Sequence, residues 1–526
     1  MGRWKALAVL GTAQFLMVLD TAVMNVSISQ LVHDFHTDVT AIQAVITLYA
    51  LVMAAFMITG GKLGDVLGRR RAFGIGLTVY GIGSLLTAVA PVLWVLALGW
   101  SVIEGLGAAI VLPALAALVA GCYQGRERAV AYGIIGGMSG VGIAVGPLLG
   151  GWVTTYLTWR LVFAGEVVVV VVLLSLLRWI TAPAEAGRRI RLDGIGAGLS
   201  ALGLALVVLG VLQSSTWGVL RPRNSPFTVF GFSATLFVIT AGVVLLTLFV
   251  SWERRREAHG LMPLVRLALL RIAPLRAGLI MLLTQSVILL GLFFVIPLYL
   301  QVVQGFNAFQ TGLRLLPVSV TMLVAALGGS SLARIASPRL LVRCGLVVML
   351  AAICWLLATI RPQIDDLPFA LAMALLGLGM GLLASQLGNV VQSSVDEEAR
   401  SEAGGLQNTA QQFGSSLGTA LIGAILIGAL AGAFNRQIAD NPQISDAVRQ
   451  QTGVAVESGV KFVPTDQVSA GLAAAGVPAD QAQHVVNAYA AAQLDGLKVA
   501  ILTAGGITLG GLAFTRRLPA ERLRTD

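Results

Sequence analysis

The chain has 526 residues, of which 57% are hydrophobic and only 11% are charged. Soluble domains carry about 25% charged residues, so this composition excludes a soluble protein and indicates one that crosses a membrane many times. The formal net charge of +10 would also suit nucleic-acid binding, but most Lys and Arg residues fall in alternate loops between apolar runs. This positive-inside pattern predicts that both termini are cytoplasmic and that the basic residues contact lipid, with no nucleic acid bound.

Residues for covalent chemistry or metal binding form no recognisable pattern. Cys122, Cys344 and Cys354 lie in or beside apolar runs and imply no disulfide framework. We find no metal-ligand spacing and no phosphate-binding loop, and the four His residues are scattered through loops. The sequence therefore predicts no cofactor, no metal ion and no enzymatic activity.

About fourteen apolar runs are close to or above the roughly 17–25 residues that a helix needs to cross a bilayer. The first run follows Arg3 and Lys5 as in a signal peptide, but it lacks a small-residue cleavage site and contains Asp20, so we interpret it as a retained helix. The predicted spans are 6–29, 43–61, 72–90, 93–120, 129–155, 161–181, 194–214, 228–250, 277–302, 313–335, 339–361, 368–391, 404–432 and 496–515.

Two polar, basic, proline-containing breaks, Thr181–Asp193 and Trp252–Pro263, divide these spans into groups of six, two and six. The predicted domains are an N-terminal six-helix bundle over 1–182, a linker with an inserted pair of spans (194–214 and 228–250) over 183–262, and a C-terminal six-helix bundle over 263–526. The last bundle contains a loop, 435–494. Counting the spans from a cytoplasmic N-terminus places this loop outside the cell. Its prolines and alanine-rich stretches predict short helices that cap the outer mouth.

The turn after the second span has a specific order of residues. Its glycines let two helix ends approach closely, and Asp65 is spaced to pair with Arg69 or Arg70 across one helical turn. A topology anchor alone would explain the arginines, but not the order Gly61-x-Leu63-x-Asp65-x-x-Gly68-Arg69-Arg70.

A second glycine pattern lies in the fifth span and consists of Gly142, Gly146, Pro147, Gly150 and Gly151. Small residues let helices pack backbone to backbone, and a proline inside a helix removes a hydrogen bond and kinks it. Helix packing alone would explain a GxxxG pair. The added proline and glycine pair point to a role in function.

These patterns resemble those of a known family. The turn resembles the loop signature between the second and third helices of the major facilitator superfamily, and the fifth-span pattern resembles the antiporter motif of that superfamily. The six-two-six plan resembles its fourteen-span drug–proton antiporter branch. The resemblance implies an all-α integral membrane protein with two six-helix transporter bundles and an inserted pair, and a conformational gating role for both glycine patterns.

Three acids, Asp20, Glu104 and Glu166, fall inside the predicted spans. A charged acid at the bilayer centre costs about 2.5–3.5 kcal/mol on insertion scales, and no Lys or Arg is predicted at mid-membrane to pair with them. Such acids are expected to bind and release protons, although a permanently neutral acid would give the same pattern. We predict a proton-coupling role for all three.

Each acid lies in a stretch that resembles a family motif. Asp20 lies in LDTAVMNVSIS, which is similar to the first-helix motif of the fourteen-span branch. Glu104 lies in WSVIEGLGAAIVLP, where Ser101 and Glu104 replace the Arg and Gln of the fourth-helix motif. These two are three residues apart on one helix face, so Glu104 is expected to take over coupling, or else to be a polar packing contact. For Glu166, near the outer end of its span, a function and a solvated position both stay open.

Polar and aromatic residues at membrane depth are candidates for a substrate cavity, although most such residues are expected to be core. The predicted cavity residues are Asn25, Ser101, Gln285, Phe293, Asn408 and Gln411. Together with these observations, the resemblance implies a monomeric, proton-coupled exporter (antiporter) of drugs or other small amphipathic molecules in the bacterial inner membrane, a function linked to antibiotic resistance. The alternatives are an exporter of an endogenous metabolite, lipid or antibiotic, and a non-transporting sensor or assembly factor on the same scaffold.

Overall fold

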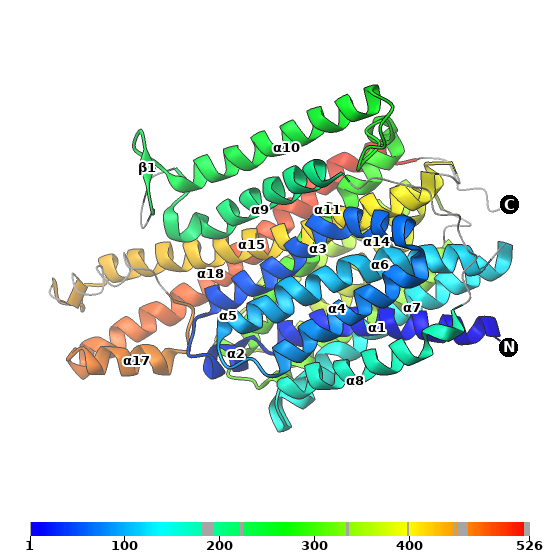
Figure 1. Ribbon diagram of the computed structural model, residues 1–526. Helices are drawn as coiled ribbons and strands as arrows, with labels where there is room; N and C mark the ends of the chain where they lie inside the picture. Colours follow the sequence, from blue (N-terminus) through cyan, green and yellow to red (C-terminus); the bar gives the residue numbers. More distant parts are fainter. Residues whose placement is uncertain are drawn as a thin grey trace.

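The computed structural model describes residues 2–123, 125–180, 193–220, 222, 225–332, 336–396, 399–446, 448–449 and 461–519. Within these ranges the protein is almost entirely helical, and its long helices run side by side (Figure 1). The start of the first long helix and the end of the last one lie at the same end of the molecule (Figure 1). We call this the terminal end, and we call the opposite end, which carries α2 and α17, the distal end.

The first part of the chain supplies six long helices, which we call the first bundle, and several short ones. Its elements are α1 (Gly2–Val26), α2 (Ile28–Asp34), α3 (Val39–Leu67), α4 (Arg69–Ala88), α5 (Leu93–Leu96), the π-helical η1 (Ala97–Glu104), α6 (Gly105–Cys122), α7 (Gly125–Tyr156), α8 (Arg160–Leu176) and η2 (Leu177–Trp179). Segments α5, η1 and α6 follow one another without a break and form one spanning helix.

The inserted pair consists of α9 (Gly194–Trp217) and α10 (Ala234–Ala258), joined through the short strands β1 (Thr228–Val229) and β2 (Phe232–Ser233). The remaining long helices form what we call the second bundle. Its elements are η3 (Leu269–Arg271), α11 (Ala273–Leu298), the π-helical η4 (Tyr299–Val303), α12 (Ala308–Leu332), α13 (Pro338–Thr359), α14 (Asp366–Ser393), α15 (Arg400–Asp440), α17 (Thr465–Ala474), α18 (Ala479–Phe514) and η6 (Thr515–Arg517).

Thirteen helices in the described ranges are long and apolar enough to cross a membrane, which confirms the prediction of an all-α membrane protein. The difference from the predicted number, about fourteen, is α4. Its first turn is Arg69-Arg70-Arg71, which lowers the average hydropathy of a helix only 20 residues long. Helix α4 still packs between α6 and α8, with Phe73, Leu77 and Tyr80 fully buried.

Several predicted boundaries differ from the structure. The predicted span 228–250 begins instead with a hairpin in which Thr228 pairs with Ser233, and the helix starts at Ala234. Gly231 has a φ of +79°, which makes the turn, and the Ser233 hydroxyl accepts a hydrogen bond from the backbone N–H of Thr235 at the start of α10.

The loop predicted over 435–494 is shorter than expected. Helix α15 continues to Asp440, and α18 runs as one 36-residue helix from Ala479, because Pro478 starts it and no proline interrupts it before Phe514. The stretch 481–492, which was expected to form a short separate helix, is therefore part of α18. Helix α17 is a short helix as predicted, and residues 450–460 lie outside the described part of the chain.

The two bundles touch in the distal half of the molecule. Amide side chains cross between them: Gln43 Nε2 donates to the Thr419 carbonyl at 2.8 Å, and Gln301 Nε2 donates to the Val26 carbonyl at 2.9 Å. Ser416 Oγ donates to the Thr47 carbonyl at 2.9 Å. These contacts join α3 to α15 and the end of α1 to η4.

The inserted pair stands beside the seam between the bundles. Helix α9 packs on α10 and also contacts both α3 and α15. A small apolar cluster marks this junction, with Leu51 from α3, Val208 and Leu212 from α9, and Ala420 from α15. The pair is thus not a free linker, because one of its helices is packed against both bundles.

Candidate functional site

A cavity of about 2520 Å³ lies between the two bundles. Its walls come from α1, α3, α6 and α7 on one side and from α11, α14 and α15 on the other. The lining reaches the terminal end, where it includes Lys62, Arg69 and the segment 262–266. At this end Arg266 Nε lies 2.5 Å from Glu402 Oε2, and this ion pair ties the segment to α15.

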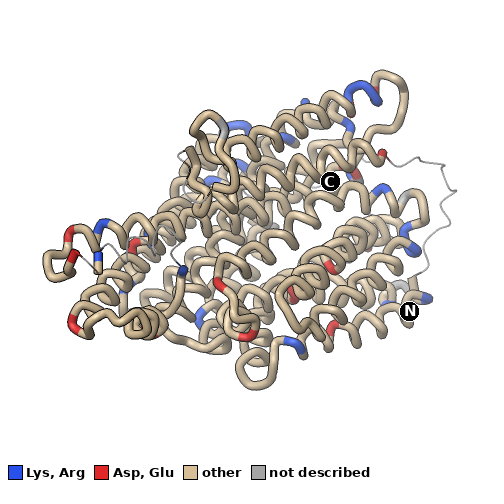
Figure 2. The backbone as a smooth tube through the Cα atoms, turned by 60° about the vertical axis from the view of Figure 1, so that its left-hand side comes forward, with Lys and Arg blue, Asp and Glu red and all other residues tan. Residues whose placement is uncertain are grey.

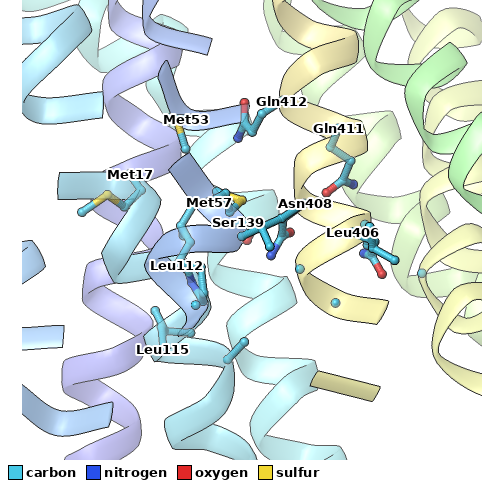
Figure 3. Close-up of a pocket in the computed structure, with 18 of the residues that line it drawn as sticks. Met17, Met53, Met57, Leu112, Leu115, Ser139, Leu406, Asn408, Gln411 and Gln412 are labelled. Atoms are coloured by element: carbon cyan, nitrogen blue, oxygen red, sulfur yellow. The ribbon is translucent and has the colours of Figure 1, made fainter. Parts of the chain in front are cut away.

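The middle of the cavity combines flexible apolar side chains with neutral amides. Met17, Met53 and Met57 come from the first bundle, and Asn408 and Gln411 come from α15 in the second (Figure 3). Methionine side chains adapt to ligands of varied shape, and a few amides can orient a ligand without requiring a charge. The cavity is therefore suited to amphipathic molecules of more than one shape.

The structure divides the predicted cavity residues into two groups. Asn25, Phe293, Asn408 and Gln411 line the cavity, whereas Ser101 and Gln285 are not among its lining residues. Ser101 Oγ donates to the Val45 carbonyl at 2.8 Å, and Gln285 Nε2 donates to the Met380 carbonyl at 3.0 Å. Both are buried and join neighbouring helices.

The three predicted acids meet in one cluster. Asp20 on α1, Glu104 at the end of η1 and Glu166 on α8 place carboxylate oxygens within 4.8 Å of one another. Their exposed fractions are 0%, 0% and 2%, so the solvated position that was left open for Glu166 is wrong. None of the salt bridges among the described residues includes an acid of this cluster.

Hydrogen bonds satisfy only part of the cluster. Trp100 Nε1 donates to Asp20 Oδ1 at 2.8 Å, and the hydroxyls of Tyr80 and Ser84 donate to Glu166 Oε2 at 3.3 and 3.1 Å. Among the described residues, no hydrogen bond of ordinary geometry reaches the other oxygen of Asp20, the other oxygen of Glu166 or either oxygen of Glu104, and all four are buried. Three adjacent negative charges without a cation would repel one another strongly, so the cluster is expected to hold protons and to exchange them as one coupled unit.

Close helix packing brings these acids together. Helix α4 lies between η1 and α8 and has glycines where they approach it: an added Cβ on Gly83 would lie 2.6 Å from the Glu104 backbone nitrogen, and one on Gly81 would lie 2.9 Å from Val170 Cγ1. The π-helical turn η1 ends at Glu104, and such turns re-aim side chains and recur at functional sites.

Sequence reasoning missed the hydrogen-bonding partners of the cluster. Tyr80 and Ser84 are polar residues four apart in an apolar helix, so they share one face. This spacing is the signal that could have identified them. Trp100 gave no such signal, because a tryptophan in an apolar helix usually packs in the core.

The first predicted gating pattern lies at the junction of α3 and α4, at the terminal end. Gly68 has a φ of +88°, a conformation that side chains other than glycine rarely adopt, and so allows the sharp reversal between the helices. Arg69 Nη1 donates to the Ala117 carbonyl at 3.0 Å, Arg70 is exposed, and Gly61 lines the cavity. The Asp65 side chain lies outside the described part of the structure, so its pairing with Arg69 or Arg70 stays a prediction.

The second predicted gating pattern packs α7 against two helices. Gly142, Gly146 and Gly150 face α1: an added Cβ on them would lie 3.0 Å from Val18 Cβ, 2.5 Å from Ala22 Cβ and 2.9 Å from Val23 Cα, respectively. On the other side of α7 the partner is α12 of the second bundle. An added Cβ on Gly151 would overlap the backbone of Ala308, and one on Gly312 would overlap the backbone of Pro147.

Comparison with protein families and curated proteins identifies one transporter family and relatives named for transport, resistance or efflux. Residues 10–419 match the model of the Major Facilitator Superfamily. The puromycin resistance protein pur8 of Streptomyces alboniger is 32% identical over 82% of this chain and 83% of its own length. The probable actinorhodin transporter of Streptomyces coelicolor is 28% identical over 83% and 75%, and the multidrug efflux pump LfrA of Mycolicibacterium smegmatis is 26% identical over 98% and 96%.

Solved structures show the same fold. A bacterial homologue of the human lysosomal transporter Spinster, in an inward-facing and unoccupied conformation, superimposes with a TM-score of 0.63 at 15% identity and covers 98% of both chains. The family match spans most of the chain, and the helical membrane fold agrees with it. The chain therefore belongs to the Major Facilitator Superfamily of membrane transporters.

Proposed function

We propose that this protein is a proton-driven antiporter that exports drugs or other small amphipathic molecules across the bacterial inner membrane as a monomer. The observation that carries the proposal is the cluster of Asp20, Glu104 and Glu166, three buried acids without a cation beside a large cavity of mixed polarity. Relatives named for efflux, resistance and antibiotic export support this choice of substrate class.

The proposed orientation places the terminal end in the cytoplasm. Lys and Arg residues lie at this end, beside the N-terminus and at the end of α10 (Figure 2), as the positive-inside rule requires. The cavity lining reaches the cytoplasm in this orientation, and the distal contacts between the bundles close the outer side. The structure then corresponds to the state that takes up substrate from inside the cell.

The position of the acids suggests how protons drive the cycle. All three belong to the first bundle, so protonation changes the charge of one bundle only. A carboxylate is costly to hold in a buried site without a counter-ion, and a conformation that hydrates the cluster would stabilise its charged form. Proton binding and release would therefore favour different conformations, which is the differential stabilisation that coupling needs.

The test is gradient-driven transport in proteoliposomes. Asp20→Asn, Glu104→Gln and Glu166→Gln should each lower efflux of the cationic dye ethidium under an imposed pH gradient. Glu253→Gln is the matched control, because Glu253 is a buried acid outside the cluster and glutamine can still accept the Val265 N–H hydrogen bond. Wild-type rates in all three cluster variants would contradict the proposal.

A second candidate, export of an endogenous antibiotic, is favoured by relatives from antibiotic-producing bacteria that are named for export, such as the cephamycin export protein of Amycolatopsis lactamdurans. Drug-susceptibility profiling of a deletion strain, together with analysis of its culture medium, separates the two. Sensitivity to many unrelated drugs supports the first candidate, and retention of one product inside the cells supports the second.

A further inference from the structure

Two aromatic residues lie where the cavity approaches the acidic cluster. Tyr49 of α3 and Trp100 of η1 are both lining residues of the cavity, whereas none of the three acids lines it. Trp100 is also the residue that donates a hydrogen bond to Asp20. The indole of Trp100 therefore contacts the cavity and the cluster at once.

The two rings form a close stack. Their centroids are 4.4 Å apart and their planes differ by 5°, and almost none of either side chain is exposed. Among the described residues the buried Tyr49 hydroxyl makes no hydrogen bond of ordinary geometry, although it lies close enough to Asp20 to interact with it. The ring stack is the defined contact between Tyr49 and Trp100.

The two helices are fastened together at the level of the stack. Ser101, next to Trp100, donates its hydroxyl to the carbonyl of Val45, one turn before Tyr49. Gly105 lets α3 approach on the other side, where an added Cβ would lie 3.3 Å from Val52 Cγ1. These contacts hold the backbones of α3 and η1 close together on both sides of the stack.

We propose that the Tyr49–Trp100 stack is a valve between the cavity and the acidic cluster, and that planar aromatic cations bound in the cavity open it. The proposal deepens the proposed function, on which it rests for the role of the cluster. A planar cation is attracted to an aromatic face and would compete with the stack for the rings. Rotation of the indole would break its hydrogen bond to Asp20 and admit cavity water to the acids. Trp100 is then a positioning residue that links substrate binding to proton release.

The first measurement is the accessibility of a site behind the valve. The three native cysteines are replaced by serine, and Ser84→Cys reports on the cluster, because Ser84 is fully buried and bonded to Glu166. Ser139→Cys is the matched control, because Ser139 lines the cavity. A small methanethiosulfonate reagent should modify the cysteine at 84 about tenfold more slowly than the one at 139, because exposure governs thiol reactivity.

Opening of the valve should remove this difference. Trp100→Ala should accelerate modification of the cysteine at 84 and leave modification of the cysteine at 139 unchanged. Ethidium added to the protein with Trp100 intact should also accelerate modification at 84. Tyr49→Leu is the second variant if Trp100→Ala does not fold. Trp159→Phe controls for loss of an indole–aspartate bond, because Trp159 Nε1 donates to Asp34 at the same 2.8 Å outside the cavity. Equal rates at 84 with and without the aromatic pair would overturn the proposal.

A second measurement connects the valve to coupling. Proteoliposomes with a trapped pH indicator should show little proton flux through the wild-type protein without substrate, and a clear substrate-independent flux through Trp100→Ala. Trp100→Phe, which keeps a ring but loses the N–H, should leak less than Trp100→Ala. A Trp100→Ala protein that transports and does not leak contradicts the valve. The cysteine modification rates are measured without a pH gradient and test the valve alone. A wild-type protein whose efflux does not respond to the pH gradient would therefore refute the proposed function and leave the test of the valve intact.

Discussion

At the scale of single residues, the three acids of the cluster differ in their partners. Asp20 is bonded to a residue that lines the cavity, and Glu166 is bonded to two hydroxyls of α4. Among the described residues, no hydrogen bond of ordinary geometry reaches either oxygen of Glu104. The same carboxyl group therefore has three different surroundings. We expect the substitutions to have different consequences for different substrates.

Asp20→Asn is expected to reduce gradient-driven efflux of every substrate to the level of liposomes without protein, because it removes the acid that is hydrogen-bonded to a residue of the cavity wall. Glu104→Gln is expected to impair cationic substrates most, since a buried carboxylate without a partner can balance their charge. Efflux of ethidium and of a neutral drug from the same proteoliposomes measures both effects. Equal losses for the two substrates in Glu104→Gln would show that its charge does not act on the substrate.

Asp34, the last residue of α2 at the distal end, differs from the cluster acids because a cation, Arg160, lies beside it. Partial burial alone would raise its pKa, but hydrogen bonds from Trp159 and Gln30 and the nearby charge of Arg160 outweigh burial and hold the pKa of Asp34 below its ordinary value of 3.8. A lowered pKa in the folded protein means that the ionised carboxyl stabilises the fold.

This stabilisation has a defined pH dependence. It is fully present above the ordinary pKa and is lost as the pH falls through the lower value of the folded protein. Asp34→Asn should therefore lower the Tm at about pH 7, and its difference from the wild type should shrink towards about pH 3. Thermal unfolding of the purified protein measures it, and a difference that stays constant with pH would contradict the role of the charge.

At the scale of helices, the glycines of α7 allow a comparison within one helix. Alanine at Gly146 would place its Cβ 2.5 Å from Ala22 Cβ, whereas an added Cβ on Gly137 meets nothing within 4 Å. Both changes raise helix propensity. Gly137→Ala is therefore the matched control: it makes the same substitution in the same helix, but the added methyl group does not collide with α1.

Gly146→Ala is expected to destabilise the protein by about 1–3 kcal/mol, the usual cost of overpacking, and to reduce efflux. Gly137→Ala should be neutral or stabilising by up to about 1 kcal/mol. The Tm in detergent and the efflux rate in proteoliposomes measure the two effects. If both variants behave alike, the fit of α7 on α1 has no part in transport.

Some elements could be predicted from the sequence and others could not, for physical reasons. Acids inside apolar runs and glycines at fixed spacing are local signals, so the sequence marks Asp20, Glu104 and the α7 pattern as candidates. Glu166 meets the other two acids because α4 packs closely on its neighbours and because η1 is a π-helical turn. Neither feature produces a hydrophobic periodicity in the sequence, so neither could be predicted from it. The contacts of Ser101 and Gln285 depend on side-chain direction in the same way.

At the scale of the whole molecule, orientation is the property to test. If the termini are cytoplasmic, α17 lies outside the cell. Ser469 in α17 is exposed, so Ser469→Cys in a cysteine-free protein should react with a membrane-impermeant maleimide added to intact cells. A cysteine placed at the exposed Arg70, at the terminal end, should react only after permeabilisation. The reverse pattern would place the cavity on the opposite side of the membrane.

The position of α9 limits how such a molecule can move. Transport by alternating access requires the two bundles to rock against each other, and α3 and α15 would then separate at the distal end. Helix α9 contacts both of them, so it cannot keep both contacts through the cycle. One of these two helix–helix contacts would have to change during transport while the other is kept, so that α9 moves with one bundle. The inserted pair would then cover the opening seam on that side and keep lipid tails out of it.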